Sequence, residues 1–312
     1  MSKLLTVFGA TGVQGGSVIK AVLADSTLSQ TFRIRAVTRD VSKPSAQALI
    51  QKGVEVVAAD MNSQSSLATA LKGTDTVFLV TLPDFVTGAA KGTEFQHGKN
   101  VADAAKSAGV KLVVFSSLIN VSDATNGRLS HVAHFDSKAE VEKYIRSQGI
   151  RATFIQPGYY MTNFLNLHLL NKADDGTYTL AGPTSPTKAL LPLFYPESDM
   201  GKYFVAAVKN PGKALGKQIH AGADYYTPTR IMEEFQQVTG KTGNYVQLDH
   251  DVYKSFIPPQ IAQELLENEL LCEGPGFFAG GSLAEGHELL AEAGLAPTTW
   301  KEYLESNKHL FD

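Results

Sequence analysis

The chain has 312 residues, of which 43% are hydrophobic and 19% are charged, and its formal net charge is −3. A chain of this length buries about three quarters of its extended surface on folding, so it can form a large core. Its 28 basic and 31 acidic residues offer no basic stripe for direct nucleic-acid contact. The single cysteine, Cys272, excludes an intrachain disulfide framework, and we expect it to be a buried, unreactive thiol.

No apolar run is long enough to span a bilayer, so we expect no membrane association. Residues 1–8 lead directly into a strand-like pattern and lack the form of a secretory signal. The sequence therefore predicts a cytoplasmic protein, with the nucleus as a second compartment to consider.

The first half of the chain alternates short apolar runs with helical stretches. The runs predict strands at 4–8, 32–38, 54–58, 76–80, 111–116 and 151–155, with helices at 18–24, 45–52, 65–71, 97–108 and 137–147 between them. Four of the six strands are continuously apolar, which is typical of a parallel sheet covered on both faces. Because such crossovers are right-handed, we predict an α/β fold with a Rossmann-type, doubly wound parallel sheet.

The pattern changes after Pro157. Loops with short elements are expected up to Pro196, then helices at 200–208, 230–238 and 261–271, a strand at 218–221 and a flexible loop at 274–281. We predict a Rossmann domain formed by residues 1–156 and about 190–224. A smaller, discontinuous second domain, residues about 157–189 and 225–312, should lie at the carboxyl-terminal edge of the sheet, where such folds bind ligands.

A glycine-rich loop joins the first predicted strand to the first helix. Its spacing is G-x-x-G-x-x-G, and small residues there let the backbone approach a pyrophosphate at a helix N-terminus. The loop therefore predicts dinucleotide binding, with contacts from Gly9, Thr11, Gly12, Val13, Gln14 and Gly15.

The end of the second strand indicates which dinucleotide is bound. Arg39 and Lys43 could hold the 2′-phosphate of NADP(H), which favours NADP(H) over NAD(H). Alternatively, Asp40 holds an unphosphorylated ribose and Arg39 is a solvated surface charge. Asp60 and Met61, after the third strand, should flank the adenine, unless Asp60 caps the following turn.

The glycine loop, Arg39, Ser116-Ser117, the 131–142 segment and Pro157–Tyr160 together resemble the NmrA-like family of atypical short-chain dehydrogenases. The resemblance covers essentially the whole chain and is strongest to the redox-sensing branch, which binds NADP(H) and often lacks dehydrogenase activity. It implies nicotinamide contacts from Pro157, Gly158, Tyr159 and Tyr160. Thr81 and Leu82, after the fourth strand, should line the cofactor channel.

The catalytic pair departs from the usual Tyr-x-x-x-Lys. Lys138 fits the lysine position, but His134 stands where the tyrosine should be. Ser137 and Glu140 form a capping-box pattern that predicts a helix start at Ser137, which would leave His134 outside the first turn. His134 is then a poor general acid and could simply pack near Phe135.

Other roles for these residues stay open. Lys138 contacts the nicotinamide ribose or pairs with Glu142, and Tyr160 is an alternative proton donor or a packing residue. Ser116 and Ser117 bind a substrate carbonyl or end their strand. The spacing of His131, His134 and Asp136 suits no common zinc pattern, so no metal is expected.

Two functions follow from this pattern. The first is a dinucleotide redox sensor that acts through a protein partner, favoured by the missing tyrosine. The second is an NADPH-dependent oxidoreductase that reduces a small carbonyl, imine or activated alkene, with Phe277-Phe278 in a lid. A non-redox enzyme on the same fold is a third reading, because fold does not dictate function. We expect a monomer or a homodimer.

Overall fold

The computed structural model describes residues 2–83 and 90–311. Its central feature is a seven-stranded sheet in the order β11-β6-β5-β4-β1-β2-β3, in which every neighbouring pair is parallel. The strands are β1 (Lys3–Val7), β2 (Phe32–Thr38), β3 (Glu55–Ala58), β4 (Thr76–Leu79), β5 (Leu112–Ser116), β6 (Ala152–Pro157) and β11 (Gln218–Ala221). The predicted Rossmann-type sheet is confirmed. Its strand order reverses direction between β1 and β4, the place where such sheets bind ligands.

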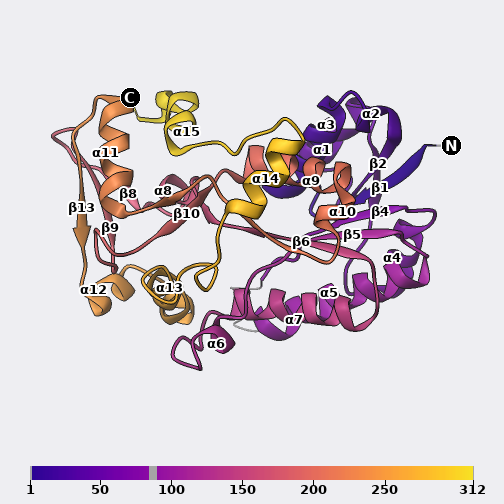
Figure 1. Cartoon of the computed structure of the whole chain (residues 1–312), viewed down its shortest axis with the longest axis horizontal. Helices are drawn as coiled ribbons and strands as arrows, with labels where there is room; N and C mark the ends of the chain where they lie inside the picture. The colour runs from indigo at the N-terminus through magenta and orange to yellow at the C-terminus, as the bar shows by residue number, and fades with distance from the viewer. Residues whose placement is uncertain (1, 84–89, 312) are drawn as a thin grey trace.

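Helices cover both faces of this sheet (Figure 1). On one face α1 (Val13–Ala24) packs against α9 (Pro196–Lys209), and α14 (Ala284–Glu292) lies beside α9. On the other face α5 (Ala90–Ser107) packs against α4 (Gln64–Leu71) and α7 (Ala133–Ser147). Each face has its own buried apolar cluster, which explains why the strands are apolar on both sides. The remaining short helices here are α2 (Leu28–Thr31), α3 (Pro44–Gln51), α6 (Val121–Ala124) and α10 (Pro211–Ala214).

A second lobe, on the left in Figure 1, contains two small sheets. One sheet has the order β12-β10-β7 and the other β13-β9-β8. The strands are β7 (Tyr159–Tyr160), β8 (Leu170–Lys172), β9 (Tyr178–Gly182), β10 (Leu191–Phe194), β12 (Tyr225–Tyr226) and β13 (Gly243–Gln247). The helices are α8 (Asn163–Asn166), α11 (Pro228–Thr239), α12 (His250–Ser255), α13 (Pro259–Leu271) and α15 (Trp300–Ser306), with a 3₁₀ turn at Lys308–Phe311. The boundaries of two domains remain a prediction.

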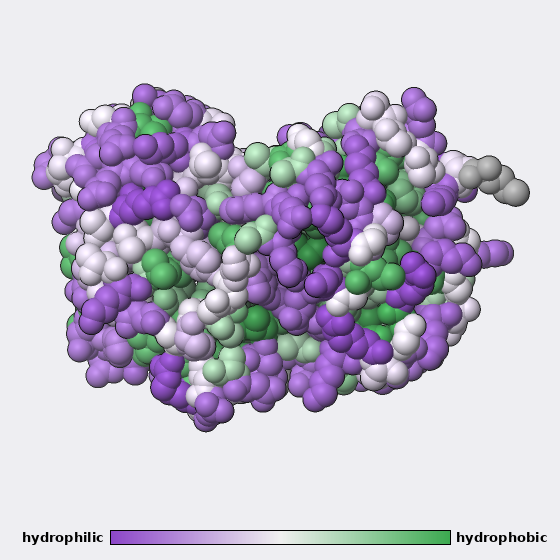
Figure 2. All heavy atoms as spheres, viewed as in Figure 1, coloured by the Kyte–Doolittle hydropathy of each residue, from purple (hydrophilic) through white to green (hydrophobic). Residues whose placement is uncertain are grey.

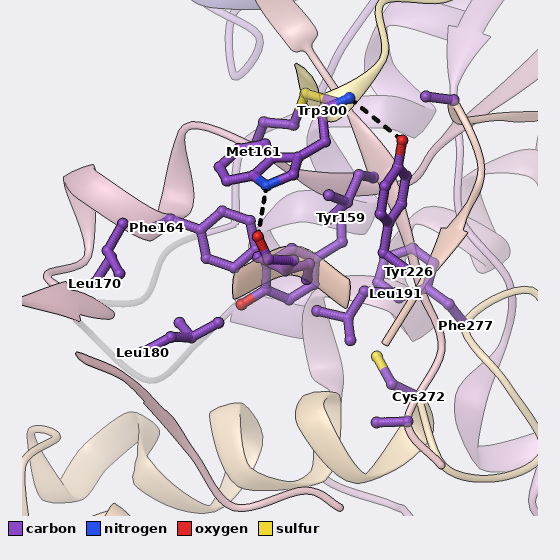
Figure 3. Close-up of a cluster of buried hydrophobic side chains, with 14 of the residues drawn as sticks. Tyr159, Met161, Phe164, Leu170, Leu180, Leu191, Tyr226, Cys272, Phe277 and Trp300 are labelled. Atoms are coloured by element: carbon purple, nitrogen blue, oxygen red, sulfur yellow. Dashed lines mark hydrogen bonds between the residues drawn. The ribbon is translucent and has the colours of Figure 1, made fainter. Parts of the chain in front are cut away.

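An aromatic-rich core holds this lobe together (Figure 3). The indole N–H of the buried Trp300 donates to the carbonyl of Ile231 at 3.0 Å, and its backbone N–H donates to the hydroxyl of Tyr226 at 3.3 Å. The core therefore satisfies the polar ends of its large rings as well as burying their apolar surface.

The loop at 274–281 differs from its expected form. Phe277 and Phe278 are 4% and 3% exposed and pack in the lobe's core, where Phe277 contacts Phe135 edge to face at 5.2 Å between ring centres. The loop expected to be flexible is therefore anchored by its two phenylalanines, and a lid role for them stays a prediction. Burial of two phenylalanine side chains contributes several kcal/mol, enough to fix a glycine-rich segment.

Most of the face seen in Figure 2 is hydrophilic, with small apolar patches and a notch at the upper edge between the two lobes. Across residues 2–83 and 90–311, no helix is both long and apolar enough to cross a membrane.

Candidate functional site

The glycine loop lies between the end of β1 and the start of α1, beside the point where the strand order reverses. Gly9 has a φ of +63°, and a Cβ there would lie 2.5 Å from Val80 Cγ1. A Cβ on Gly15 would lie 2.3 Å from the carbonyl oxygen of Gly9. Both positions therefore require glycine, because the loop folds tightly onto the first turn of α1.

The first turn of α1 presents backbone N–H groups at the mouth of this loop. Gly12 caps the helix, and the first intrahelical hydrogen bond runs from the Gly16 N–H to the Gly12 carbonyl at 2.9 Å. The N–H groups of Val13, Gln14 and Gly15 precede that bond, and the first turn carries no acidic side chain. Thr11, Gly12 and Val13 are exposed, so an anion can approach. This cradle fits the pyrophosphate of a dinucleotide.

The cations expected at the adenosine end lie at the same edge of the sheet. β2 is the direct neighbour of β1, and Arg39 follows its last residue with an exposed side chain. Lys43 is also exposed and precedes α3. Asp40 accepts hydrogen bonds from the N–H and hydroxyl of Ser42 at 2.9 and 2.6 Å, which lower the pKa of its carboxyl. Asp40 is thus already engaged in a local turn, while both cations face solvent.

Asp60 and Met61 follow β3, the outermost strand on this side. One oxygen of Asp60 accepts the Asn62 N–H at 2.9 Å, so its side chain caps the following turn. Met61 is partly buried, and its carbonyl accepts a hydrogen bond from Asn100 at 2.8 Å. The capping role of Asp60 is therefore present, and contact of either residue with an adenine stays a prediction.

The helix that carries Lys138 begins earlier than predicted. α7 starts at Ala133, so the expected start at Ser137 is wrong. Carboxylates of α13 explain the difference: Glu264 accepts the backbone N–H of His134 at 2.9 Å, and Glu267 accepts that of His131 at 2.8 Å. Glu264 thus satisfies a donor that a helix start leaves unpaired, and Glu267 holds the residue before the N-cap Val132.

His134 consequently lies one helical turn before Lys138, in the i, i+4 relation of the usual catalytic pair. Its ring Nδ1 is 2.5 Å from Glu264 Oε1, and its ring packs edge to face on Phe135 at 4.9 Å between centres. A carboxylate in this position fixes the orientation of the imidazole ring. His131 makes the equivalent contact with Glu267 at 2.6 Å. Asp136 instead caps α6, accepting the Val121 N–H at 2.8 Å.

Lys138 is 7% exposed and lies in a polar cluster under the end of β4. Its ammonium donates to the carbonyl and hydroxyl of Thr81 at 2.7 and 3.0 Å and forms an ion pair with Glu94. Glu94 is fully buried on α5 and also accepts hydrogen bonds from Thr81, at 2.6 Å, and Ser137. Three acceptors match the three donors of a lysine.

The alternative pairing of Lys138 with Glu142 is wrong. Glu142 instead accepts hydrogen bonds from Ser117 at 2.6 Å and from Arg146 at 2.8 Å. Sequence reasoning also missed Glu94, because its partner lies 44 residues away and no local pattern marks the pair. Ser116 is buried, and its hydroxyl has no partner among the described residues. Leu82, next to Thr81, is 69% exposed.

Pro157–Tyr160 connects the end of β6 to the second lobe. A Cβ on Gly158 would lie 2.0 Å from the Pro192 carbonyl oxygen, so β7 passes very close to β10. The hydroxyl of Tyr160 accepts a hydrogen bond from Gln14 of the glycine loop, and burial raises the Tyr160 pKa to about 12. Tyr160 is therefore positioned beside the loop but is a weak proton donor.

Tyr159 points away from the loop into the second lobe. Its hydroxyl donates to Glu269 on α13 at 2.9 Å. Cys272, one turn further along, is 2% exposed, and burial raises the pKa of its thiol, as expected for an unreactive cysteine. Of the predicted site residues, the structure thus places the glycine loop, Tyr160, Thr81, Lys138 and His134 along one edge of the sheet.

Known proteins are similar to this chain over most of its length. The model of the NmrA-like family matches residues 1–304. The NmrA-like family domain-containing oxidoreductase malD of Malbranchea aurantiaca is 34% identical over an alignment of 257 positions, which covers 79% of this chain and 76% of malD. An NmrA-like family domain-containing protein of Dictyostelium discoideum is 28% identical to this chain. That alignment covers the full length of both proteins.

Solved structures share the fold over nearly the whole length. The negative transcriptional regulator NmrA in complex with NADP has a TM-score of 0.80 and 23% identity, covering 99% of this chain and 96% of its own. The NADPH-dependent quinone oxidoreductase of Escherichia coli, complexed with NADPH, has a TM-score of 0.74 and 25% identity, covering 99% of this chain and 100% of its own. With its family match and its relative at 34% identity, this chain belongs to the NmrA-like family.

Proposed function

We propose that this protein binds NADP(H) in the Gly9–Gly15 loop and is an NADPH-dependent oxidoreductase. The cradle of N–H groups at the start of α1 supports the binding, because only glycine fits at Gly9 and Gly15. Arg39 and Lys43, both exposed at the end of the neighbouring strand, support the preference for a 2′-phosphate. Solved relatives in complex with NADP, NADPH and NAD support the binding of a nicotinamide dinucleotide.

The position of His134 carries the assignment of reductase chemistry. His134 lies one turn before Lys138, at the sheet edge that also holds the glycine loop, and Glu264 orients its ring. When bound, the nicotinamide would supply the hydride. His134 would supply the proton to the reduced substrate, and Lys138 would position α7 against Thr81. The malD relative is also described as an oxidoreductase.

A dinucleotide sensor is the second candidate, and one observation favours it. All three donors of Lys138 are satisfied by Thr81 and Glu94, so this lysine has none left for a ribose without rearrangement. A sensor would need different affinities for NADP⁺ and NADPH, because a ligand shifts a conformation only by binding its states unequally.

Calorimetric titration of the protein with NADP⁺, NADPH, NAD⁺ and NADH tests the binding. We expect at least tenfold preference for the phosphorylated forms, equivalent to about 1.4 kcal/mol, and loss of that preference in Arg39→Ala. Arg33→Ala is the matched control, since Arg33 is an exposed arginine at the opposite end of β2. An equal preference in both variants would contradict the 2′-phosphate site, and no binding at all would contradict the whole proposal.

NADPH oxidation with a panel of carbonyls, quinones, imines and enones then separates the two candidates. Turnover that falls about 10²–10⁴-fold in His134→Asn, with unchanged NADPH affinity, is expected for a general acid. His309→Asn, on the exposed 3₁₀ turn, should leave turnover unchanged. Absence of turnover across the panel, together with unequal affinities for NADP⁺ and NADPH, would instead support the sensor.

A further inference from the structure

Strand β13 forms an open edge of the second lobe. The order of its sheet is β13-β9-β8, so among residues 2–83 and 90–311 β9 is the only strand that pairs with β13. Figure 1 shows β13 at the outer margin of the lobe, on the left of the view. An open edge of this kind presents unpaired N–H and C=O groups to which another strand can bind.

The pairing of β13 with β9 determines which of its backbone groups face inward. The Thr242 carbonyl accepts the N–H of Tyr178 at 2.8 Å, and the N–H of Leu248 donates to the Gly182 carbonyl at 2.8 Å. Backbone groups alternate in direction along a strand. The even-numbered residues of this segment therefore direct their N–H and C=O groups toward β9.

The odd-numbered residues Gly243, Tyr245 and Gln247 direct their N–H and C=O groups toward the open edge. Within residues 2–83 and 90–311, no other segment hydrogen-bonds to these groups. Proteins usually protect such an edge with a proline or a charged side chain, and the segment 243–247 contains neither. The edge is therefore available to a further strand.

One pairing of this edge with a second copy of the chain uses all of its outward groups. Two identical subunits most often associate about a two-fold axis, which makes the paired strands antiparallel. With Tyr245 opposite Tyr245 of the second copy, Gly243 lies opposite Gln247. A shift of one strand by two residues would place Gly243 opposite Asp249, or Gln247 opposite Lys241, and both of these residues lie outside β13.

The same register brings opposite charges together at both ends of the paired edge. Lys241 precedes β13 and Asp249 follows it, at equal distances in sequence from Tyr245. The two-fold axis therefore places Lys241 opposite Asp249 of the second copy, and the reverse pair forms at the other end. Among the residues that the structure describes, Lys241 has no acidic partner within its own chain. Opposite charges facing each other across strands stabilise their pairing.

Exposed apolar side chains adjoin this edge. Val246 of β13 is 38% exposed, and Val252 and Phe256, one turn apart at α12, are 45% and 75% exposed. Helix α12 begins directly after Asp249, so in the paired form it lies at the end where β13 of the second copy starts. Covering these side chains would add apolar burial to the backbone hydrogen bonds.

We infer that β13 is an interface between two copies of this chain. The two strands pair antiparallel about Tyr245, and the small sheets β13-β9-β8 of both copies become one continuous sheet. The glycine loop lies in the other lobe, so this interface neither requires nor blocks a dinucleotide, and the inference is independent of the proposed function. A strand from a different protein would find the same hydrogen-bonding groups but not the symmetric pairing of Lys241 with Asp249.

Sedimentation velocity between about 1 and 200 µM tests the inference, because interfaces of modest area range widely in affinity. We expect the wild-type protein to change from monomer to dimer as its concentration rises. Lys241→Glu places like charges opposite each other and should weaken the dimer at least tenfold. Adding Asp249→Asn removes this repulsion while keeping a side chain that can cap α12, and it should restore part of the loss.

Lys20→Glu is the matched control, because it makes the same change in net charge at an exposed position on α1. It should leave the dimer unchanged. A monomer at every concentration would overturn the inference, and so would a dimer that Lys241→Glu leaves unchanged.

A second pair of variants tests the backbone hydrogen bonds. Gln247→Pro removes an N–H that faces the open edge and not β9, so the pairing of β13 with β9 should be retained while the dimer weakens at least tenfold. Gln247→Val keeps the N–H and should keep the dimer. Equal association of the two variants would overturn the inference.

Amide exchange of the wild-type protein locates the interface without a variant. The outward amides of Tyr245 and Gln247 should exchange at least tenfold more slowly at the highest of these concentrations than at the lowest. The amide of Leu248, already bonded to Gly182, should be equally protected at both. A dimer whose β13 amides gain no protection would overturn the inference. A monomer that binds NADPH would overturn the inference alone, whereas a β13 dimer that binds no dinucleotide would contradict only the proposed function.

Discussion

Single glycines decide whether the cofactor cradle can form. Gly15 and Gly16 are neighbours in α1, yet a Cβ at Gly15 meets the Gly9 carbonyl at 2.3 Å, whereas one at Gly16 meets only the Ala10 carbonyl at 3.7 Å. The second distance is an ordinary contact. Gly15 is therefore required by the close packing of the glycine loop, whereas Gly16 could be replaced without a clash.

We predict that Gly15→Ala lowers the free energy of unfolding by about 1–3 kcal/mol and abolishes dinucleotide binding, because backbone must move to admit the methyl group. Gly16→Ala should leave binding intact and raise stability by up to about 1 kcal/mol, since alanine is the better helix former. Urea unfolding and calorimetry measure both. Retained binding in Gly15→Ala would contradict the role of the cradle.

The raised pKa of Glu269 predicts a pH-dependent stability at the residue scale. Its carboxyl has a folded pKa of about 7 against an ordinary value of 4.5, because burial disfavours the charge. Below pH 4.5 the carboxyl is protonated in both the folded and the unfolded protein, and the protonated group contributes its full share to stability. This contribution is lost as the pH rises through 7, because ionisation is easier in the unfolded chain. Glu269→Gln should thus become more stable than the wild type by up to about 3 kcal/mol at pH 8, and no more stable at pH 4.5. Urea unfolding at both pH values measures this difference. An equal difference in the free energy of unfolding between variant and wild type at pH 8 and at pH 4.5 would contradict the prediction.

At the scale of elements, sequence periodicity predicts regular segments well, but it does not predict helix starts that depend on tertiary contacts. The strand at 32–38 and the strand at 218–221 coincide with β2 and β11, in which apolar residues alternate with polar ones as the period of a strand requires. Strands β7 and β12 have two residues each, too few to show alternation. The start of α7 depends on carboxylates from α13, about 130 residues away, so no local capping pattern could show it.

The contact between α7 and α13 predicts local rather than global effects. Glu264→Ala removes the partner of the His134 N–H, and loss of such a cap costs about 1 kcal/mol. We expect faster amide exchange over the first turn of α7, roughly fivefold, with unchanged exchange in the central strands. Gln260→Ala, exposed one turn earlier on α13, is the control. Equal exchange in both variants would show that α7 needs no support from α13.

At the scale of the whole molecule, the candidate site joins the sheet edge to the second lobe. Tyr160 and Tyr159 connect the two sides through one strand, and Glu264 and Glu267 hold α13 against the start of α7. The fold and the glycine loop could be predicted from sequence, because they depend on local patterns. The partners Glu94, Glu264 and Glu269 could not, because helical glutamates are usually solvated and only the assembled structure buries them.

A ligand that binds the folded state stabilises all parts that must be folded for binding. We predict that NADPH at 100 times its dissociation constant raises the free energy of unfolding by about 2.7 kcal/mol in a single transition. NADH at the same concentration should give a smaller increase, and Gly15→Ala should show none. Thermal unfolding followed separately by tyrosine fluorescence and by circular dichroism checks whether one transition or two are seen.

The position of β11 next to β6 also has a consequence for the newly made protein. The chain leaves the sheet after Pro157 and returns at Gln218. About 60 residues must therefore be synthesised after β6 before β11 can pair with it. At roughly 5–20 residues per second, this takes several seconds on the ribosome. During that time β6 is an unpaired edge whose hydrogen-bonding groups can capture other strands. Chaperone demand should therefore be greatest while residues 158–217 emerge, before β11 covers this edge of the sheet.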